Sequence, residues 1–140
     1  MLGLNQSEMS FSMYDGFLKD GVNLEPVKLT AFNRTFFILV SVRSQFIYQW
    51  VTLLASPLES KNYTYQSKVD NGDSVSSYTQ VRSMCEIHEE IIEKQLAFVI
   101  GIPVARRLMN QDGIIEVSVK LRSLKDEAKD ETDESGIDDD

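Results

Sequence analysis

Residues 36–55, FFILVSVRSQFIYQWVTLLA, decide the fold that this sequence predicts. Two apolar runs, 36–42 and 46–55, are rich in β-branched and aromatic side chains, and the three polar residues 43–45 separate them. Runs of this length and composition are typical of β-strands. A polar connection this short between two such runs predicts an antiparallel hairpin.

The sequence on both sides of this hairpin predicts more strands and few helices. Further strands are expected at residues 10–18, 27–32, 62–69, 75–81, 96–100 and 114–121. A loop is expected at 56–61, a capping box of the form S-x-x-E at 83–86 predicts a helix over 86–95, and a second helical turn is expected over 104–109. Seven or eight strands with mostly hairpin-length links, and one or two short helices, predict an antiparallel β-sandwich.

Charge divides the chain into two parts. Residues 125–140 contain nine acidic residues and two lysines, a net charge of −7, whereas the whole chain has −8. The difference leaves −1 for residues 1–124, which we expect to be the folded domain. Residues 125–140 have one large aliphatic side chain, Ile137, and no aromatic one, so we expect a disordered acidic tail.

Composition also argues against several classes of protein. A single cysteine permits no intrachain disulfide, and the N-terminus has no secretory signal, so a cytoplasmic or nuclear location is expected. The most apolar stretch is too short and too interrupted to span a membrane. No basic face is evident in the nearly neutral part of the chain, so no nucleic-acid partner is expected.

The stretch SMCEIHEE, residues 83–90, contains the only cysteine and the only histidine, Cys85 and His88. Two such ligands among carboxylates could start a zinc site, but no second cluster supplies the remaining ligands. A Cys–His nucleophile pair would need a third, orienting group, and no motif supports one. A capped helix start explains the stretch more simply, so no catalytic residue, metal or cofactor is predicted. A thiol enzyme using Cys85 and His88 is the less favoured alternative.

A series of stretches in a definite order carries a resemblance to a known family. They are FFILVSVRSQ (36–45), IYQWVTLLAS (47–56), NYTYQSKVDNG (62–72), Arg82-Ser83, Ile87-His88-Glu89, LAFVIGIPVARRL (96–108) and GIIEVSVKL (113–121). From residue 36 to residue 121, a span of 86 of the 140 positions, the chain resembles the C-terminal substrate-binding domain of the seven-in-absentia ubiquitin ligases, a branch of the TRAF-like, MATH-related β-sandwiches. It also resembles the TRAF-like domain of cysteine- and histidine-rich proteins. Three residues, 84–86, stand inserted within the family's arginine-serine-isoleucine-histidine-glutamate run.

The resemblance implies a protein-interaction domain that binds substrates or partners. Members of the family have a RING and zinc fingers, bind extended peptides on the sandwich, and dimerise through this domain. One cysteine can build neither a RING nor a zinc finger, so a piece of a longer protein, or a member with only the binding half, is expected. The implied role is a non-catalytic adaptor in ubiquitin-ligase-linked regulation, with proteins or short extended peptides as partners and dimerisation as a further property.

The resemblance also places a peptide groove along the predicted strand 27–32 and beside the last strand. The residues it implies are Val27, Leu29 and Glu116, where the family has an amide at the position of Glu116. A carboxylate only accepts hydrogen bonds, so a different peptide preference is expected. Two alternatives stay open: these are ordinary strand residues, or the domain serves only for structural oligomerisation.

Overall fold

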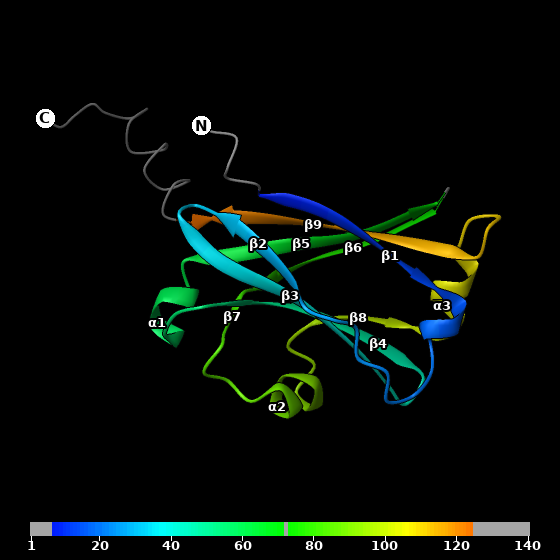
Figure 1. Cartoon of the computed structure of the whole chain (residues 1–140), viewed down its shortest axis with the longest axis horizontal. Coiled ribbons are helices and arrows are strands. Elements are labelled where there is room, and N and C mark those ends of the chain that lie inside the picture. Colours follow the sequence, from blue (N-terminus) through cyan, green and yellow to red (C-terminus); the bar gives the residue numbers. More distant parts are fainter. Residues whose placement is uncertain (1–6, 72, 125–140) are drawn as a thin grey trace, which may run out of the picture.

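The computed structural model describes residues 7–71 and 73–124, which form two β-sheets packed face to face (Figure 1). The strands are β1 (Glu8–Tyr14), β2 (Val27–Ala31), β3 (Arg34–Arg43), β4 (Phe46–Leu53), β5 (Tyr63–Asn71), β6 (Asp73–Gln80), β7 (Arg82–Ser83), β8 (Phe98–Gly101) and β9 (Ile114–Ser123). The helices are short: α1 (Pro57–Ser60), α2 (His88–Glu93) and α3 (Ile102–Arg107), with a 3-10 turn at Asp15–Phe17.

Each sheet contains strands that are not all neighbours in the sequence. One sheet has four strands in the order β1-β9-β5-β6. The other has the order β2-β3-β4, and the far edge of β4 is shared by β8, which is antiparallel, and the two-residue β7, which is parallel. Because β6 lies against β8 on one side of the sandwich, the edges on the opposite side are β1 and β2. Figure 1 shows β1 and β2 on the side nearest the viewer.

Alternate residues of the strands fill the space between the sheets. Among the largest fully buried side chains on the strands are those of Tyr65, Phe36, Met13, Leu29, Ile38, Ile47, Leu53, Ile115 and Leu121. Phe36 contacts the ring of Tyr63 edge to face, with 5.3 Å between ring centroids, and so joins β3 to β5. Burial of one large apolar side chain contributes about 1.5–3 kcal/mol, and the buried aliphatic and aromatic side chains together hold the sheets in contact.

Two-residue turns close the hairpins of the five-stranded sheet. Ser44 and Gln45, with φ of 53° and 72°, connect β3 to β4, and Phe32 and Asn33, with φ of 53° and 59°, connect β2 to β3. Positive φ at both central residues matches the right-handed twist of the strands. The predicted hairpin is therefore present, with a connection one residue shorter than the polar run suggested.

The predicted fold class, a mainly β sandwich with few short helices, is confirmed. Some local predictions were wrong. The strand expected over 10–18 ends at Tyr14, the loop expected at 56–61 contains α1, and the strand count rises to nine within the described residues because the two-residue β7 pairs with β4. The predicted tail, 125–140, lies outside the described residues.

The helix predicted from residue 86 begins two residues later, at His88. One of the two bonds of a capping box is present, from the Ser83 amide to the Glu86 carboxylate at 3.0 Å, but Ser83 Oγ accepts from the Cys85 amide at 3.0 Å, and the Glu86 amide donates to the Ser83 carbonyl. They close a turn after β7, however, and Ile87 occupies the N-cap of α2 without a side-chain cap. The signature therefore marked a real turn but not the first turn of the helix.

Candidate binding edge and neighbouring apolar hollow

Cys85 and His88, the predicted alternative centre, take part in different local contacts. Cys85 is exposed and its amide is bonded to Ser83, whereas the His88 ring packs edge to face on Trp50 with 5.4 Å between centroids. Trp50 is buried, so this contact docks the start of α2 on the outer face of β4. Within the described part of the chain, no group of three or more His, Cys, Asp and Glu residues could hold a metal ion.

The segment between β7 and α2 is held to the sheet by a small polar network. Glu86 accepts hydrogen bonds from Arg82 at 2.7 and 3.1 Å and from the Ser83 amide at 3.0 Å. Partial burial raises the pKa of the Glu86 carboxyl, but the hydrogen bonds from Arg82 and Ser83 lower it by more. The pKa of Glu86 therefore lies below its ordinary value. Met84 donates its amide to Leu53 at 3.0 Å. The Ser83–Glu86 turn therefore has a structural explanation, and no chemistry is needed to account for it.

The residues predicted for peptide binding are divided between the two sheets. Val27 and Leu29 lie on β2, at the edge of the five-stranded sheet, whereas Glu116 lies on β9, which is paired with β1 on one side and β5 on the other. Leu29 is 2% exposed, and its side chain belongs to the core. Glu116 is exposed on the outer face of its sheet, beside a shallow hollow of about 250 Å³ that it shares with Glu8, Lys68 and Ser118. Val27 is half-buried at the sheet edge, so it alone of the three places its side chain beside an unpaired strand edge.

The free side of β2 presents backbone groups as well as side chains. Leu54, just after β4, donates its amide to the carbonyl of Thr35 at 3.0 Å, so Thr35 directs its backbone groups toward β4. Bonding direction alternates along an antiparallel strand, so Phe37 does the same. Their partners on β2 are Thr30 and Lys28. The N–H and C=O groups of Lys28 and Thr30 therefore point away from β3, toward the open edge of the sheet.

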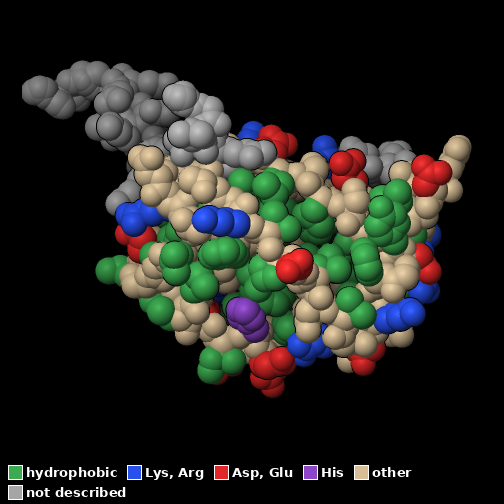
Figure 2. Space-filling model, viewed as in Figure 1, with side chains coloured by type: hydrophobic (Ala, Val, Ile, Leu, Met, Phe, Trp, Pro, Cys, Tyr) green, Lys and Arg blue, Asp and Glu red, His purple; other side chains and the backbone are tan. Residues whose placement is uncertain are grey.

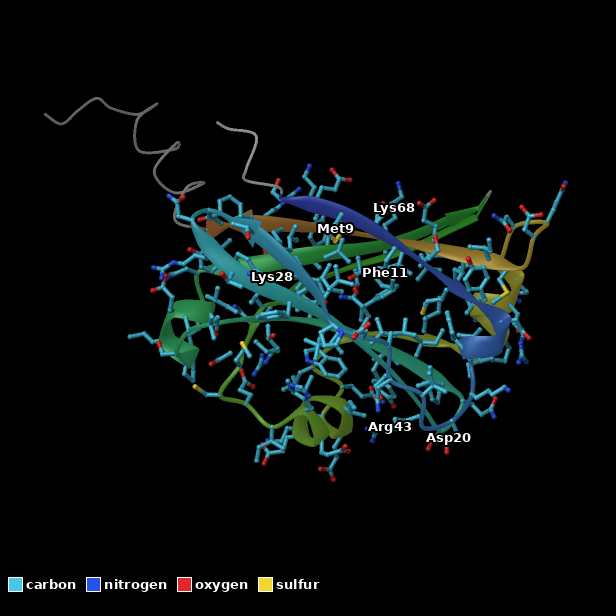
Figure 3. The ribbon with its side chains drawn as sticks, viewed as in Figure 1. Met9, Phe11, Asp20, Lys28, Arg43 and Lys68 are labelled. Carbon is cyan, nitrogen blue, oxygen red and sulfur yellow. The ribbon has the colours of Figure 1, made fainter. Side chains whose placement is uncertain are left out.

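Half-buried apolar side chains lie beside this edge. Met9 and Phe11 of β1 and Val27 of β2 pack against the core without being fully enclosed. Figure 3 shows Met9 and Phe11 on the side of β1 that faces the other sheet, with Lys28 on β2 at the same side of the molecule. The two unpaired edges and these three side chains together form what we call the β1–β2 edge, defined by Met9, Phe11, Val27, Lys28 and Thr30.

An apolar hollow adjoins the start of β2 on the outer face of the five-stranded sheet. It has a volume of about 240 Å³ and is lined by Pro26, Phe37, Leu39, Thr52, Met84 and His88. Figure 2 shows hydrophobic side chains gathered across this side of the molecule, around the single histidine. Exposed apolar patches on a protein surface often mark interaction sites. Because Pro26 directly precedes Val27, the hollow and the β1–β2 edge are neighbours.

Sequence reasoning missed the residues of the hollow, although one signal was present. Phe37 and Leu39 alternate with the buried Phe36 and Ile38, so they point to the outer face of β3. Two large apolar side chains on the outer face of a strand indicate either a covering element or a binding surface. Met84 and His88 could not be found in this way, because Met84 reaches the hollow from the turn after β7 and His88 from the start of α2.

Comparison with protein-family models gives no match to this chain, and comparison with curated protein sequences gives none either. Within residues 7–71 and 73–124, no helix is both long and apolar enough to cross a membrane.

Proposed function

We propose that this chain is a non-catalytic protein-interaction domain that binds an extended peptide as an added strand along β2. The observation that carries the proposal is the β1–β2 edge, where the backbone groups of Lys28 and Thr30 have no partner within residues 7–71 and 73–124 and lie next to half-buried apolar side chains. In strand addition, main-chain hydrogen bonds supply affinity, and alternate side-chain contacts supply specificity. The five residues of β2 would pair with a segment about 17 Å long, at about 3.3 Å per residue.

The apolar surroundings explain why a peptide would gain free energy there. Side chains of the added strand that face inward would cover Met9, Phe11 and Val27, each of which is half-buried in the free domain. Removal of apolar surface from water contributes about 25 cal/mol per Å². A side chain at one end of the peptide could also enter the hollow beside Pro26.

The wider role that we propose is that of an adaptor in ubiquitin-ligase-linked regulation, with proteins or short extended peptides as partners. The support for this role is the resemblance of residues 36–121 to the seven-in-absentia and TRAF-like domains. In this proposal any ligase activity comes from other domains or from a partner protein.

A proline substitution tests the proposal, because proline removes a backbone donor without altering a charge. Thr30→Pro removes an N–H that points to the open edge, so the sheet keeps its internal bonds and peptide binding should be lost. The probe is an array of immobilised twelve-residue peptides with alternating apolar and polar residues. Retention of peptide binding by folded Thr30→Pro would refute strand addition at β2.

The matched control is Ser76→Pro on β6, at the opposite edge of the other sheet. Val81 donates its amide to Tyr63 at 3.2 Å, so the alternating pattern directs the backbone groups of Ser76 away from β5. Ser76→Pro should therefore bind the same peptides as the unmodified chain. Circular dichroism of both variants establishes that each retains its β-structure.

The unpaired edge of β6 favours a second candidate, a structural oligomerisation domain. In that case Ser76→Pro, and not Thr30→Pro, would change the molar mass measured by light scattering. A single pair of variants therefore separates the two functions.

A further inference from the structure

The charge at the β1–β2 edge indicates what kind of peptide would fit there. Lys28 is exposed on the outer face of β2, and among the described residues it forms no ion pair. The other cations near this sheet differ, since Arg34 bonds Glu59 at 2.8 Å and Arg43 bonds Glu89 at 2.9 Å. Lys28 is therefore an unpaired positive charge in the middle of an edge strand.

Strand addition fixes which peptide residues would meet Lys28. The side chains of β2 alternate, with Lys28 and Thr30 outward and Val27, Leu29 and Ala31 inward. A residue paired with Lys28 would point outward beside it, and its two sequence neighbours would point inward. This pattern is the same whether the added strand runs parallel or antiparallel to β2.

We propose that the partner is a peptide segment of the form apolar–acidic–apolar, with its Asp or Glu directly opposite Lys28. This inference rests on the proposed function. The two apolar residues cover Met9, Phe11 and Val27, and the carboxylate pairs with the Lys28 ammonium. Opposite charges directly across a β-pair stabilise it and like charges destabilise it. Lys28 is therefore a specificity-determining residue, separate from the backbone groups that provide affinity.

The proposal is tested with three soluble fluorescent peptides, binding the full chain and followed by fluorescence anisotropy. Each has the core Thr-Val-Xaa-Val-Thr between Gly-Ser flanks, where Xaa is Asp, Asn or Lys. An opposite-charge pair across two strands stabilises their pairing by about 0.2–1 kcal/mol, and a like-charge pair destabilises it by a similar amount. We therefore expect the Asp peptide to bind about fivefold more tightly than the Lys peptide. The difference should shrink as salt is added, since Lys28 is exposed.

Lys28→Glu should invert the order, so that the Lys peptide binds best. The matched control is Lys120→Glu, which makes the same charge change on β9, in the other sheet. That variant should keep the order of the unmodified chain. An unchanged order in Lys28→Glu, or equal binding of all three peptides, would overturn the charge preference.

The outcomes separate this inference from the proposed function. If all three peptides bind equally and Thr30→Pro abolishes their binding, strand addition stands and the role of Lys28 is wrong. If none of the three binds, the proposed function fails together with the inference. If the Lys120→Glu control inverts the order as well, the preference reflects net charge and not a partner opposite Lys28.

Discussion

A polar pair in the core offers the sharpest prediction about how the two sheets are held together. Gln49 of β4 is 2% exposed and points between the sheets, where its side-chain oxygen accepts a hydrogen bond from Ser67 of β5. The hydroxyl of Tyr65 donates to the backbone carbonyl of Gln49 at 3.3 Å. Gln49 Nε2 has no hydrogen-bond partner among the described residues. Gln49 and Ser67 therefore form a hydrogen-bonded polar pair across the sheets, and among the described residues the Nε2 of the same amide has no partner.

The perturbation is a pair of near-isosteric substitutions, Ser67→Ala and Gln49→Met. Ser67→Ala leaves both polar atoms of the Gln49 amide without partners, and one further unsatisfied buried group costs about 1–3 kcal/mol. Gln49→Met removes the unbonded Nε2 but leaves the Ser67 hydroxyl unpaired, so the two effects partly cancel. The double variant removes every member of the pair, and replacement of both partners by apolar groups of similar shape is nearly neutral or stabilising. The coupling between the two sites should therefore be about 1–3 kcal/mol.

Urea unfolding at 25 °C, followed by tryptophan fluorescence, measures the free energy of unfolding of the four proteins. We expect Ser67→Ala to be the least stable and the double variant to be at least as stable as the unmodified chain. If the two substitutions add, so that the double variant loses the sum of the single losses, Gln49 and Ser67 do not form a coupled pair.

Single contacts lead to three further predictions. Burial raises the pKa of the Tyr65 hydroxyl well above its ordinary value of 10.0, so the contribution of this group to stability is present below pH 10 and lost as pH rises above it. In urea titrations, the free energy of unfolding should therefore fall less between pH 7 and pH 11 for Tyr65→Phe than for the unmodified chain. An equal fall would contradict this. Partial burial raises the pKa of Glu86, but the hydrogen bonds from Arg82 and Ser83 outweigh it and hold this pKa below 4.5, so the contribution of the carboxylate to stability is present above pH 4.5 and lost as pH falls. Glu86→Gln should therefore show a smaller fall in the free energy of unfolding at acid pH. An unchanged fall would count against the Arg82 contact. Val27→Asp should weaken peptide binding because it puts a charge on the inward-facing side of β2, where apolar side chains of the peptide would lie, whereas Glu116→Arg, on the outer face of the other sheet, should leave binding unchanged. Loss of binding in Glu116→Arg would show that the peptide lies elsewhere.

The sequence predicted the parts of the fold that depend on local pattern. The hairpin of residues 36–55 was predictable because each strand is long and rich in β-branched and aromatic residues, and the turn between them is short and polar. The boundaries of elements that depend on tertiary contacts were not predictable from the sequence. β7 has only two residues and exists because it pairs with Thr52 and Leu53 of β4, and no periodicity can be read from two residues.

The candidate site was predictable only in part, for a related reason. The alternation of Val27, Leu29 and Ala31 with Lys28 and Thr30 is visible in the sequence and would have assigned Leu29 to the core. Whether β2 is an edge strand depends on the order of strands in the sheet, which a single sequence does not contain. The separation of Glu116 from β2 likewise depends on β1, which pairs with β9 at this position.

The most direct test of strand addition at β2 is hydrogen exchange at individual backbone amides, measured by NMR with and without the Thr-Val-Asp-Val-Thr peptide. The amide of Leu29 faces β3 and should be protected in both states, and the amide of Ser76 should exchange freely in both. The amides of Lys28 and Thr30 should exchange freely in the unbound chain and become protected when the peptide binds. Saturable peptide binding with no protection of Lys28 and Thr30 would contradict strand addition at β2.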